Sequence, residues 1–373
     1  MRTFWRRRML AVVVAAALVA AACGDSDDGS DTAAEDASAS ESADNTGSEP
    51  VEEAGDSAAE DETTEAEDAG GAEDAADYYP LTISDSFGTE YTFEEEPRIG
   101  CAWYGCVEAA AELGVSFAAS IISEEETTSA FYGRTAPEFL VTDMTNPEEW
   151  AAADVDIVLF SPASNSPDFD PVSQVVDTFF LHYDNFLAPQ WDGVIGGYEG
   201  YIENLRLIGT MMNREAEAEA AIARFNTMVE NLAVYATDET AEQTIAIIGL
   251  LGYASLGPGS AMCQVLNEAG HGTCIGSGVA EVLNAEAFLA IDPSLIIDVD
   301  PAAREGDPIW PNLSAVQNDN VYNFLTNRYY CCSTAGLIVA LQEYVHRVFP
   351  DSGVPAPGPD ADFDPTTSPL VQG

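Results

Sequence analysis

The sequence predicts an α/β fold made of two lobes joined by one long helix. Short apolar runs of strand length alternate with helical segments twice, between residues 98 and 181 and again between residues 244 and 349. Strands that alternate with helices form parallel sheets covered by helices. A helical segment with one apolar stripe separates the two series. The length of 373 residues suits about two domains, and a hydrophobic share of 46% suffices for a sizeable core.

The first lobe begins with a hairpin pattern over residues 81–93. A short strand at Arg98–Cys101 and a helix at Val107–Leu113 follow it. Two later apolar runs, Asp156–Phe160 and Thr178–Leu181, have the length of buried strands.

The helical region in the middle of the chain has two parts. Tyr201–Met212 is the first, and a break at Asn213 leads into the second, Glu215–Tyr235. Apolar residues recur in the second part at three- and four-residue steps, which predicts one buried face.

The strand and helix pattern then restarts to form the second lobe. Thr244–Leu251 and Leu295–Val299 are predicted strands, and Ala261–Ala269 is a predicted helix between them. A closing helix is expected at Ala335–Phe349. The rest, Asp351–Gly373, is rich in Pro and Gly and is expected to be an irregular tail.

The N-terminus has the features of a secretory signal peptide at residues 1–22. A start with four arginines precedes 14 uninterrupted apolar residues, which is a typical length for such a peptide and too short to span a membrane. Leu18–Cys23 resembles the bacterial lipoprotein cleavage box, in which the cysteine is lipidated and becomes the mature N-terminus. We therefore expect Cys23 to anchor the protein to the outer face of the cytoplasmic membrane. Ordinary secretion with a chance cysteine is the alternative.

An acidic segment follows this cysteine. Residues 24–77 hold 21 acidic residues and no basic one, so they are expected to form a disordered spacer or, alternatively, an acidic interaction tail. The predicted organisation is a signal peptide (1–22), a lipidated cysteine with an acidic tether (23–77), a first lobe (78–213), a connecting helix (214–236), a second lobe (237–350) and a tail (351–373).

The charge of the chain excludes several kinds of function. The formal charge is −53, from 65 acidic and 12 basic residues, and every basic residue is an arginine. A chain without lysine has no Schiff-base lysine and no phosphate-loop lysine. Nucleic-acid binding requires a basic patch, which this composition argues against.

The cysteines beyond the leader are candidates for disulfides, because disulfides persist outside the cytoplasm. They form three local pairs: Cys101 with Cys106, Cys263 with Cys274, and Cys331 with Cys332. The middle pair would bracket the predicted helix of the second lobe. Adjacent cysteines pair only with strain, so bridges from the last pair to the first are conceivable. The alternative is that these four cysteines together bind a soft metal such as zinc or copper(I).

Several motifs occur in a fixed order over residues 78–350. They are Pro97-Arg98-Ile99 followed by Glu108 and Gly114, Asn146–Trp150 leading to Asp156-Ile157-Val158, Glu286–Pro293 leading to Leu295-Ile296-Ile297, and Leu313–Val316 followed by Val321-Tyr322. Their order and spacing resemble the extracytoplasmic binding proteins of ABC importers for cobalamin, haem and ferric siderophores. The resemblance implies two Rossmann-like lobes, one rigid connecting helix and a ligand cleft between the lobes.

The resemblance also implies how the protein docks. Glu148 and Glu286 stand at equivalent positions in the two lobes, each at the head of a helix that leads into a strand. In the family, such glutamates bind arginines of the membrane permease, one from each lobe. Helix stabilisation by a carboxylate near the first turn is the alternative role, and Glu149 could substitute for Glu148.

Aromatic residues are the candidate ligand contacts, since they suit flat and partly apolar chelates. Two arginines could neutralise a carboxylate-bearing siderophore or could form surface ion pairs. The candidate ligand-binding residues are Trp103, Tyr104, Arg134, Tyr253, Arg328, Tyr329 and Tyr330.

The chain shows no constellation typical of an enzyme. It has only three histidines and no G-x-S-x-G turn for a nucleophile. The sequence therefore predicts a monomeric, lipid-anchored binding protein, without a cofactor of its own, that delivers an iron or cobalt chelate to an ABC permease. The alternative is a surface lipoprotein that handles metals or redox equivalents through its cysteine pairs, and a non-metal solute is a third reading.

Overall fold

The computed structural model describes residues 78–122, 129, 131–162, 165–182, 194–249, 252–324, 333–358 and 364–372. All described residues belong to one compact unit, Asp68–Gly373. Several predicted features lie outside the described residues: the signal peptide, Cys23, the tether, Arg328, Tyr329, Tyr330, Cys331 and Cys332.

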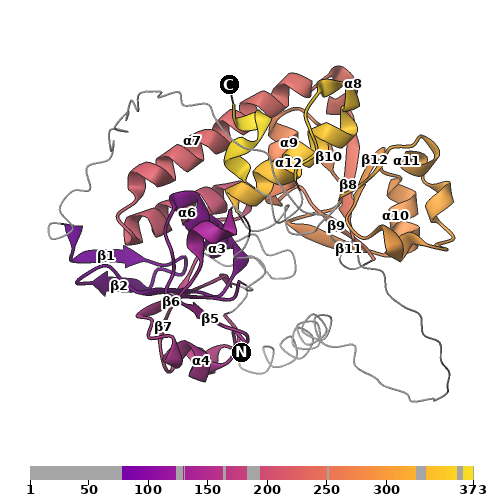
Figure 1. Ribbon diagram of the computed structural model, residues 1–373. Helices are drawn as coiled ribbons and strands as arrows, with labels where there is room; N and C mark the ends of the chain where they lie inside the picture. Colours follow the sequence, from indigo (N-terminus) through magenta and orange to yellow (C-terminus); the bar gives the residue numbers. More distant parts are fainter. Residues whose placement is uncertain are drawn as a thin grey trace, which may run out of the picture. The chain divides into compact units, whose positions relative to one another are not determined.

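The first lobe contains a parallel sheet, as predicted (Figure 1). In the described part of the chain its strands run in the order β5 (Phe139–Leu140), β4 (Ala119–Ser120), β3 (Ile99–Cys101), β6 (Ile157–Phe160) and β7 (Asp177–Phe180). The predicted hairpin consists of β1 (Leu81–Ser84) and β2 (Glu90–Phe93). The helical elements are α3 (Tyr104–Leu113), η3 (Tyr132–Thr135), α4 (Pro147–Ala152) and α5 (Asp170–Ser173).

The central strands of this sheet are buried on both faces, which explains their continuous apolar sequence. Every residue of β3 and β6 is buried. Gly100 in β3 leaves room for the ring of Trp150, because a Cβ there would lie 2.8 Å from its Cζ3 atom. The helix after β3 ends at Gly114, whose φ of 68° provides a left-handed cap that most residues adopt only at a cost.

The second lobe contains a mixed sheet, which adds antiparallel strands to the parallel arrangement that the sequence predicts. The described strands run in the order β11 (Ala280–Leu283), β9 (Tyr253–Leu256), β8 (Thr244–Ile248), β12 (Leu295–Asp298) and β13 (Val321–Asn323), with β10 (Thr273–Cys274) also beside β8. β9 is antiparallel to both β8 and β11. The link between β8 and β9 is only residues 249–252, which is too short for a parallel crossover.

The remaining helical elements of this lobe surround the sheet. They are α8 (Asp238–Ala241), α9 (Ala261–Glu268), α10 (Ala285–Ile291), η6 (Pro301–Arg304), η7 (Trp310–Asn312), α11 (Ser314–Gln317) and α12 (Thr334–Val348).

The predicted connecting helix is confirmed as α7 (Glu215–Leu232), continued by a single turn of 3-10 helix, η5 (Ala233–Tyr235). Its predicted apolar stripe is buried at Ile222, Phe225, Met228 and Leu232. The preceding helix, α6 (Gly197–Met211), packs against it. The predicted break at Asn213 has a left-handed φ of 51°.

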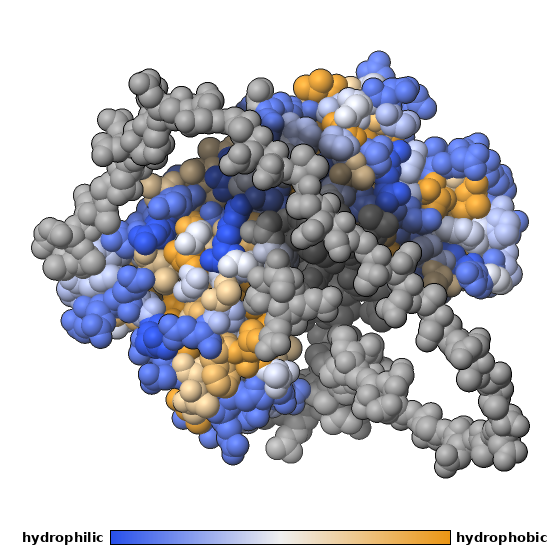
Figure 2. Space-filling model, viewed as in Figure 1, coloured by the Kyte–Doolittle hydropathy of each residue, from blue (hydrophilic) through white to orange (hydrophobic). Residues whose placement is uncertain are grey.

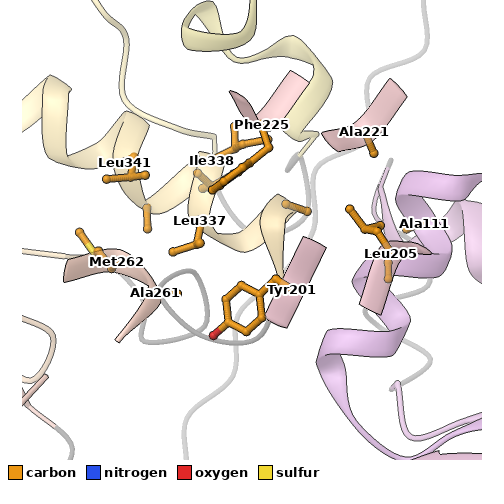
Figure 3. Packing of buried hydrophobic residues seen from close by; sticks show 14 of the residues in the cluster. Ala111, Tyr201, Leu205, Ala221, Phe225, Ala261, Met262, Leu337, Ile338 and Leu341 are labelled. Atoms are coloured by element: carbon orange, nitrogen blue, oxygen red, sulfur yellow. The ribbon is translucent and has the colours of Figure 1, made fainter. Parts of the chain in front are cut away.

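A shared hydrophobic core lies among these helices. One cluster of buried residues includes side chains of α3 in the first lobe, of α6 and α7, and of α9 and α12 in the second lobe (Figure 3). Phe225 of α7 and Leu337 of α12 are two of its fully buried members. Helices from both halves of the sequence therefore bury one apolar surface, which opposes large movements between them.

The described part of the C-terminal segment consists of short elements that pack against the body. It forms the short turns η8 (Pro350–Ser352), η10 (Pro365–Thr367) and η11 (Pro369–Val371). Leu370 is buried, and the Nδ2 atom of Asn231 on α7 donates to its carbonyl oxygen at 2.8 Å. Within the described ranges, no helix has both the length and the apolar character needed to cross a membrane.

Candidate functional site

The carboxyl end of β3 carries a short loop closed by a disulfide. Cys101 is the last residue of the strand, and it pairs with Cys106 of α3 across a Cα–Cα distance of 6.0 Å. Trp103 and Tyr104 lie inside this covalent ring, and both side chains are half-buried. Ligands of α/β proteins bind at the carboxyl ends of parallel strands. The loop therefore holds two predicted ligand contacts where such a ligand would lie.

This pairing corrects two alternatives drawn from the sequence. Because Cys101 and Cys106 are bonded to each other, neither bridges to Cys331 or Cys332. Disulfide sulfurs are not thiolates, so the first pair is also not part of a four-cysteine zinc or copper(I) site. Among the described side chains, no group of three or more His, Cys, Asp or Glu residues is arranged to hold a metal ion.

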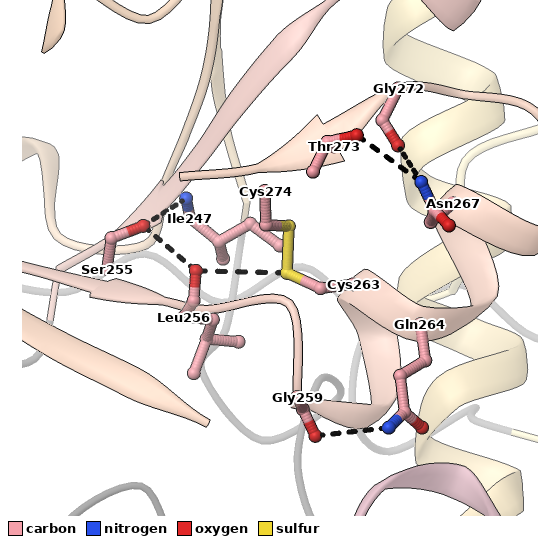
Figure 4. The surroundings of a disulfide bond; sticks show 10 residues. All are labelled: Ile247, Ser255, Leu256, Gly259, Cys263, Gln264, Asn267, Gly272, Thr273 and Cys274. Atoms are coloured by element: carbon pink, nitrogen blue, oxygen red, sulfur yellow. Dashed lines mark hydrogen bonds between the residues drawn. A yellow bond between two sulfur atoms is a disulfide. The ribbon is translucent and has the colours of Figure 1, made fainter. Parts of the chain in front are cut away.

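The predicted pairing of Cys263 with Cys274 is confirmed, with a Cα–Cα distance of 5.7 Å (Figure 4). The bridge links α9 to β10, and Asn267 supports the same corner by donating to the carbonyl oxygen of Gly272 at 3.1 Å. An open hollow of about 390 Å³ lies next to it, lined by α6, α9 and β10. This hollow is not at the carboxyl ends of the central strands.

Tyr253 lies in the second lobe at the start of β9, directly after the predicted strand Thr244–Leu251. The first strand, β8, ends at Ile248 and not at Leu251, because the chain then reverses to form the antiparallel strand β9. Only 8% of Tyr253 is exposed. Its hydroxyl donates to Oδ2 of Asp307 at 2.5 Å, and its ring packs against Phe288 with centroids 4.6 Å apart. Burial, with the hydrogen bond to Asp307 second, raises the pKa of Tyr253.

Arg304, which no sequence motif marks, lies at the centre of this region. Its side chain is 4% exposed, and its Nε atom lies 3.3 Å from Oδ2 of Asp298, whose side chain is fully buried. The guanidinium also donates to the carbonyl oxygen of Gly252 at 2.6 Å. It lies over the rings of Tyr253 and Trp310, at 5.1 and 5.7 Å from their centroids. Burial raises the pKa of Asp298, while the neighbouring amide of Asp300 and the charge of Arg304 oppose that rise.

Arg134 lies away from the Trp103 loop. It is in η3, it is exposed, and it forms an ion pair with Asp364 of the C-terminal segment. The structure thus shows one of the two alternatives for this residue, a surface ion pair. The sequence offers no signal for a partner 230 positions away.

The two candidate docking glutamates have matching local structures. Asn146 caps α4 by accepting from the backbone N–H of Glu148, and Asn284 caps α10 by accepting from that of Ala287. Glu148 and Glu286 are each the second residue of their helix, and both are exposed.

The repeat continues past these helices. Eight residues after each capping asparagine, an aspartate has a left-handed φ, 53° at Asp154 and 48° at Asp292. Three residues later an inner strand of the lobe's sheet begins, β6 or β12. The two lobes therefore present one exposed glutamate each on the same helix-to-strand unit.

Glu149 differs from its neighbour Glu148. Its carboxylate accepts from the backbone N–H and the hydroxyl of Thr142, at 2.6 and 3.0 Å. The N–H of Thr142 lowers the pKa of Glu149. Glu149 thus holds the loop after β5, while Glu148 points to no partner that the described structure records.

The family model described as "Periplasmic binding protein" matches residues 136–325, which is more than half of the chain. The chain belongs to the periplasmic binding protein family. The binding protein matches no curated protein by sequence.

Solved structures of binding proteins share the fold. The triscatecholate siderophore-binding protein FeuA from Bacillus subtilis, in complex with ferri-bacillibactin, has a TM-score of 0.58 and 15% identity, and the match covers 72% of this chain and 98% of that one. SirA from Staphylococcus aureus, in complex with staphyloferrin B, has a TM-score of 0.54, 15% identity and the same two coverages, 72% and 98%. A variant of the heme-binding protein HmuT has a TM-score of 0.51 and 16% identity, with coverages of 69% and 82%.

At these identities the likeness shows the fold and not the ligand. It confirms the predicted α/β architecture with two lobes. Membership of the family makes the chain a substrate-binding protein and not an enzyme, and it implies an extracytoplasmic location.

Proposed function

We propose that this binding protein is the extracytoplasmic component of an ABC importer. It captures an iron- or cobalt-containing chelate, a ferric siderophore first and cobalamin or haem next, and delivers it to the permease. The family and the fold support this role. Among proteins of the same fold, FeuA is in complex with ferri-bacillibactin, SirA is in complex with staphyloferrin B, and HmuT is a heme-binding protein. One observation carries the importer role: an exposed glutamate at the second position of an asparagine-capped helix, repeated in both lobes.

This arrangement suits docking to a two-fold symmetric permease. Each glutamate offers a free carboxylate that an arginine can bind through two parallel hydrogen bonds. Two equivalent carboxylates on two lobes match two equivalent arginines on a dimer. The neighbouring Glu149 is committed to Thr142 and is therefore a poor substitute.

The docking role is tested by charge reversal. We expect the double variant Glu148→Arg/Glu286→Arg to bind its chelate normally but to lose most uptake of labelled iron in cells with the cognate permease. Glu239 provides a matched control, because it is also an exposed second residue of a short capped helix, α8. Uptake that survives the double reversal, or falls equally in Glu239→Arg, would show that the two glutamates do not dock.

The cargo is proposed to contact the disulfide-closed loop after β3. Trp103 and Tyr104 offer half-buried aromatic surface, which suits the apolar face of a chelate. Titration of intrinsic tryptophan fluorescence with ferric siderophores, cobalamin and haem should give saturable quenching for one class. The response should be lost in Trp103→Ala/Tyr104→Ala. If none of the three classes binds, the cargo is not an iron or cobalt chelate.

The membrane attachment is also a proposal. Cys23 would carry the lipid, and residues 24–77 would hold the binding protein away from the membrane surface. Radioactive fatty acid should label the wild-type protein and not Cys23→Ser, which should appear in the soluble fraction. Equal labelling of the two proteins would remove Cys23 as the anchor.

A further inference from the structure

The cations of the body are nearly all committed to carboxylates. Residues 78–373 contain 44 acidic residues and eight arginines, without a lysine. Seven of these arginines lie in the described ranges, and each has an acidic partner within 4 Å. The pairs are Arg98–Glu138, Arg134–Asp364, Arg206–Glu219, Arg214–Glu217, Arg224–Glu112, Arg304–Asp298 and Arg347–Glu343.

Arg304 is the described arginine nearest to the carboxyl ends of the second sheet. Its charge is compensated by groups inside the protein. Asp298 at the end of β12 pairs with it, and the carbonyl oxygen of Gly252 accepts from it. Tyr253 and Trp310 lie against the guanidinium. Turning this group toward an anionic ligand would leave Asp298 buried without its counter-charge, which is costly.

The surroundings of this pair add negative charge. Asp300 and Glu305 are exposed beside η6, and Asp307 accepts from Tyr253. These three carboxylates have no arginine partner among the described residues, which do not include Arg328. The described wall at this end of the second sheet is therefore acidic.

The described residues that follow the strands of the first sheet include no arginine, and Asp143 follows β5. The loop after β3 presents Trp103 and Tyr104, and Ser161 follows β6. His182 follows β7, where burial lowers its pKa and its Nδ1 atom accepts from the N–H of Ile195 at 3.1 Å. A neutral imidazole contributes no positive charge at pH 7.

Hydrophilic residues are spread over the outer surface of both lobes on the face in Figure 2.

We propose that the cargo carries a neutral or positive net charge, as a trishydroxamate iron chelate does, and that polyanionic catecholate and carboxylate chelates are excluded. This inference rests on the proposed function and names the chemical class that its site accepts. The cause is electrostatic: an acidic wall in a strongly acidic body attracts cations and repels anions during approach and in the complex.

The test compares three ferric chelates of similar size and different charge. The probes are ferrioxamine B, with a charge of about +1, neutral ferrichrome, and a ferric triscatecholate, with a charge of about −3. We expect one of the first two to bind at least about 100-fold more tightly than the triscatecholate in 50 mM salt. Equal or tighter binding of the triscatecholate would overturn the charge rule and leave the importer function standing. Binding of none of the three, nor of haem or cobalamin, would overturn both.

A matched pair of variants tests where the selectivity arises. Asp300 and Asp319 are both exposed aspartates of the second lobe, but Asp300 follows the carboxyl end of β12 and Asp319 precedes the amino end of β13. Asp300→Asn should weaken binding of ferrioxamine B about threefold in low salt, and Asp319→Asn should leave it unchanged. Equal effects of the two substitutions would show that the second-lobe wall does not select charge.

Discussion

Glu112 on α3 accepts a hydrogen bond from the hydroxyl of Thr334, the first residue of α12, at 2.5 Å. One turn earlier on α3, Glu108 accepts from the hydroxyl of Ser333, the residue that caps α12. Both carboxylates are buried. The first lobe thus holds the start of the last helix of the second lobe, independently of the connecting helix. Two buried carboxylates at a helix start also favour the helix dipole.

We expect Thr334→Val to destabilise the protein by about 1–3 kcal/mol, because it leaves a buried oxygen of Glu112 without its donor. The side chain keeps its volume, so the loss would reflect the hydrogen bond and not a cavity. Chemical denaturation measures the free energy of unfolding. The control is Thr227→Val on α7, a half-buried residue whose hydroxyl donates to the carbonyl oxygen of Ala223 in an exposed hydrogen bond, where a change within about 0.5 kcal/mol is expected. Equal effects of the two substitutions would mean that the Glu112 contact contributes nothing.

The same carboxyl group predicts a pH dependence. Burial raises the pKa of Glu112, although Thr334 and Arg224 oppose the rise. A raised pKa in the folded state means that the folded protein binds the proton more tightly than the unfolded chain. Its contribution to stability is therefore complete below the unfolded pKa of about 4.5 and is lost as the pH rises through the folded pKa.

Replacement by Gln removes this titration. Glu112→Gln should therefore gain stability relative to the wild type as the pH is raised from about 4.5 toward 8. Denaturation of both proteins at pH 5, 6, 7 and 8 measures the difference. A difference that stays constant over this range would show that Glu112 does not titrate differently in the two states.

The sequence predicted the parts of the fold that depend on local pattern. β6 begins one residue inside the predicted run Asp156–Phe160, because a continuous apolar run suits a strand that is buried on both faces. The connecting helix followed from a stripe of 3.6-residue period, and the Cys263–Cys274 bridge followed from the closeness of the two cysteines in the sequence.

The rest depends on contacts that no local pattern records. Arginines and glutamates are usually exposed, so nothing in the sequence marks Arg304, Glu108 or Glu112 as buried. Glu108 and Glu112 are buried because hydroxyls at the start of α12 compensate their carboxylates. Arg304 is buried because Asp298 and the carbonyl oxygen of Gly252 compensate its charge. The partner of Glu112, Thr334, lies 222 positions away.

The buried pair of Arg304 and Asp298 predicts a non-additive response. Arg304→Met should cost about 3–5 kcal/mol, because it leaves the carboxylate of Asp298 buried without its counter-charge. The double variant Arg304→Met/Asp298→Asn should be more stable than the single variant, since no charge then remains buried. Denaturation of the three proteins provides the comparison. A double variant less stable than Arg304→Met would contradict the assignment of the cost to the unpaired charge.

Removal of either disulfide should lower the stability of the protein to a similar extent, but only one removal should weaken ligand binding. Replacement of either pair by serine should lower the free energy of unfolding by about 2–3 kcal/mol. The loss is modest because the bonded cysteines are only 5 and 11 positions apart in the sequence. Only the Cys101/Cys106 ring contains Trp103 and Tyr104, so its removal frees the proposed ligand loop to adopt other shapes. An ordered loop binds with a smaller entropy cost.

We therefore expect Cys101→Ser/Cys106→Ser to bind its chelate at least about tenfold more weakly, by the same fluorescence titration, at a temperature where the protein is folded. Cys263→Ser/Cys274→Ser serves as the matched control and should bind within about twofold of the wild type. If both variants lose affinity equally, the effect is one of general stability. If neither does, the loop after β3 is not a ligand contact, and the cargo must be held by other strand ends.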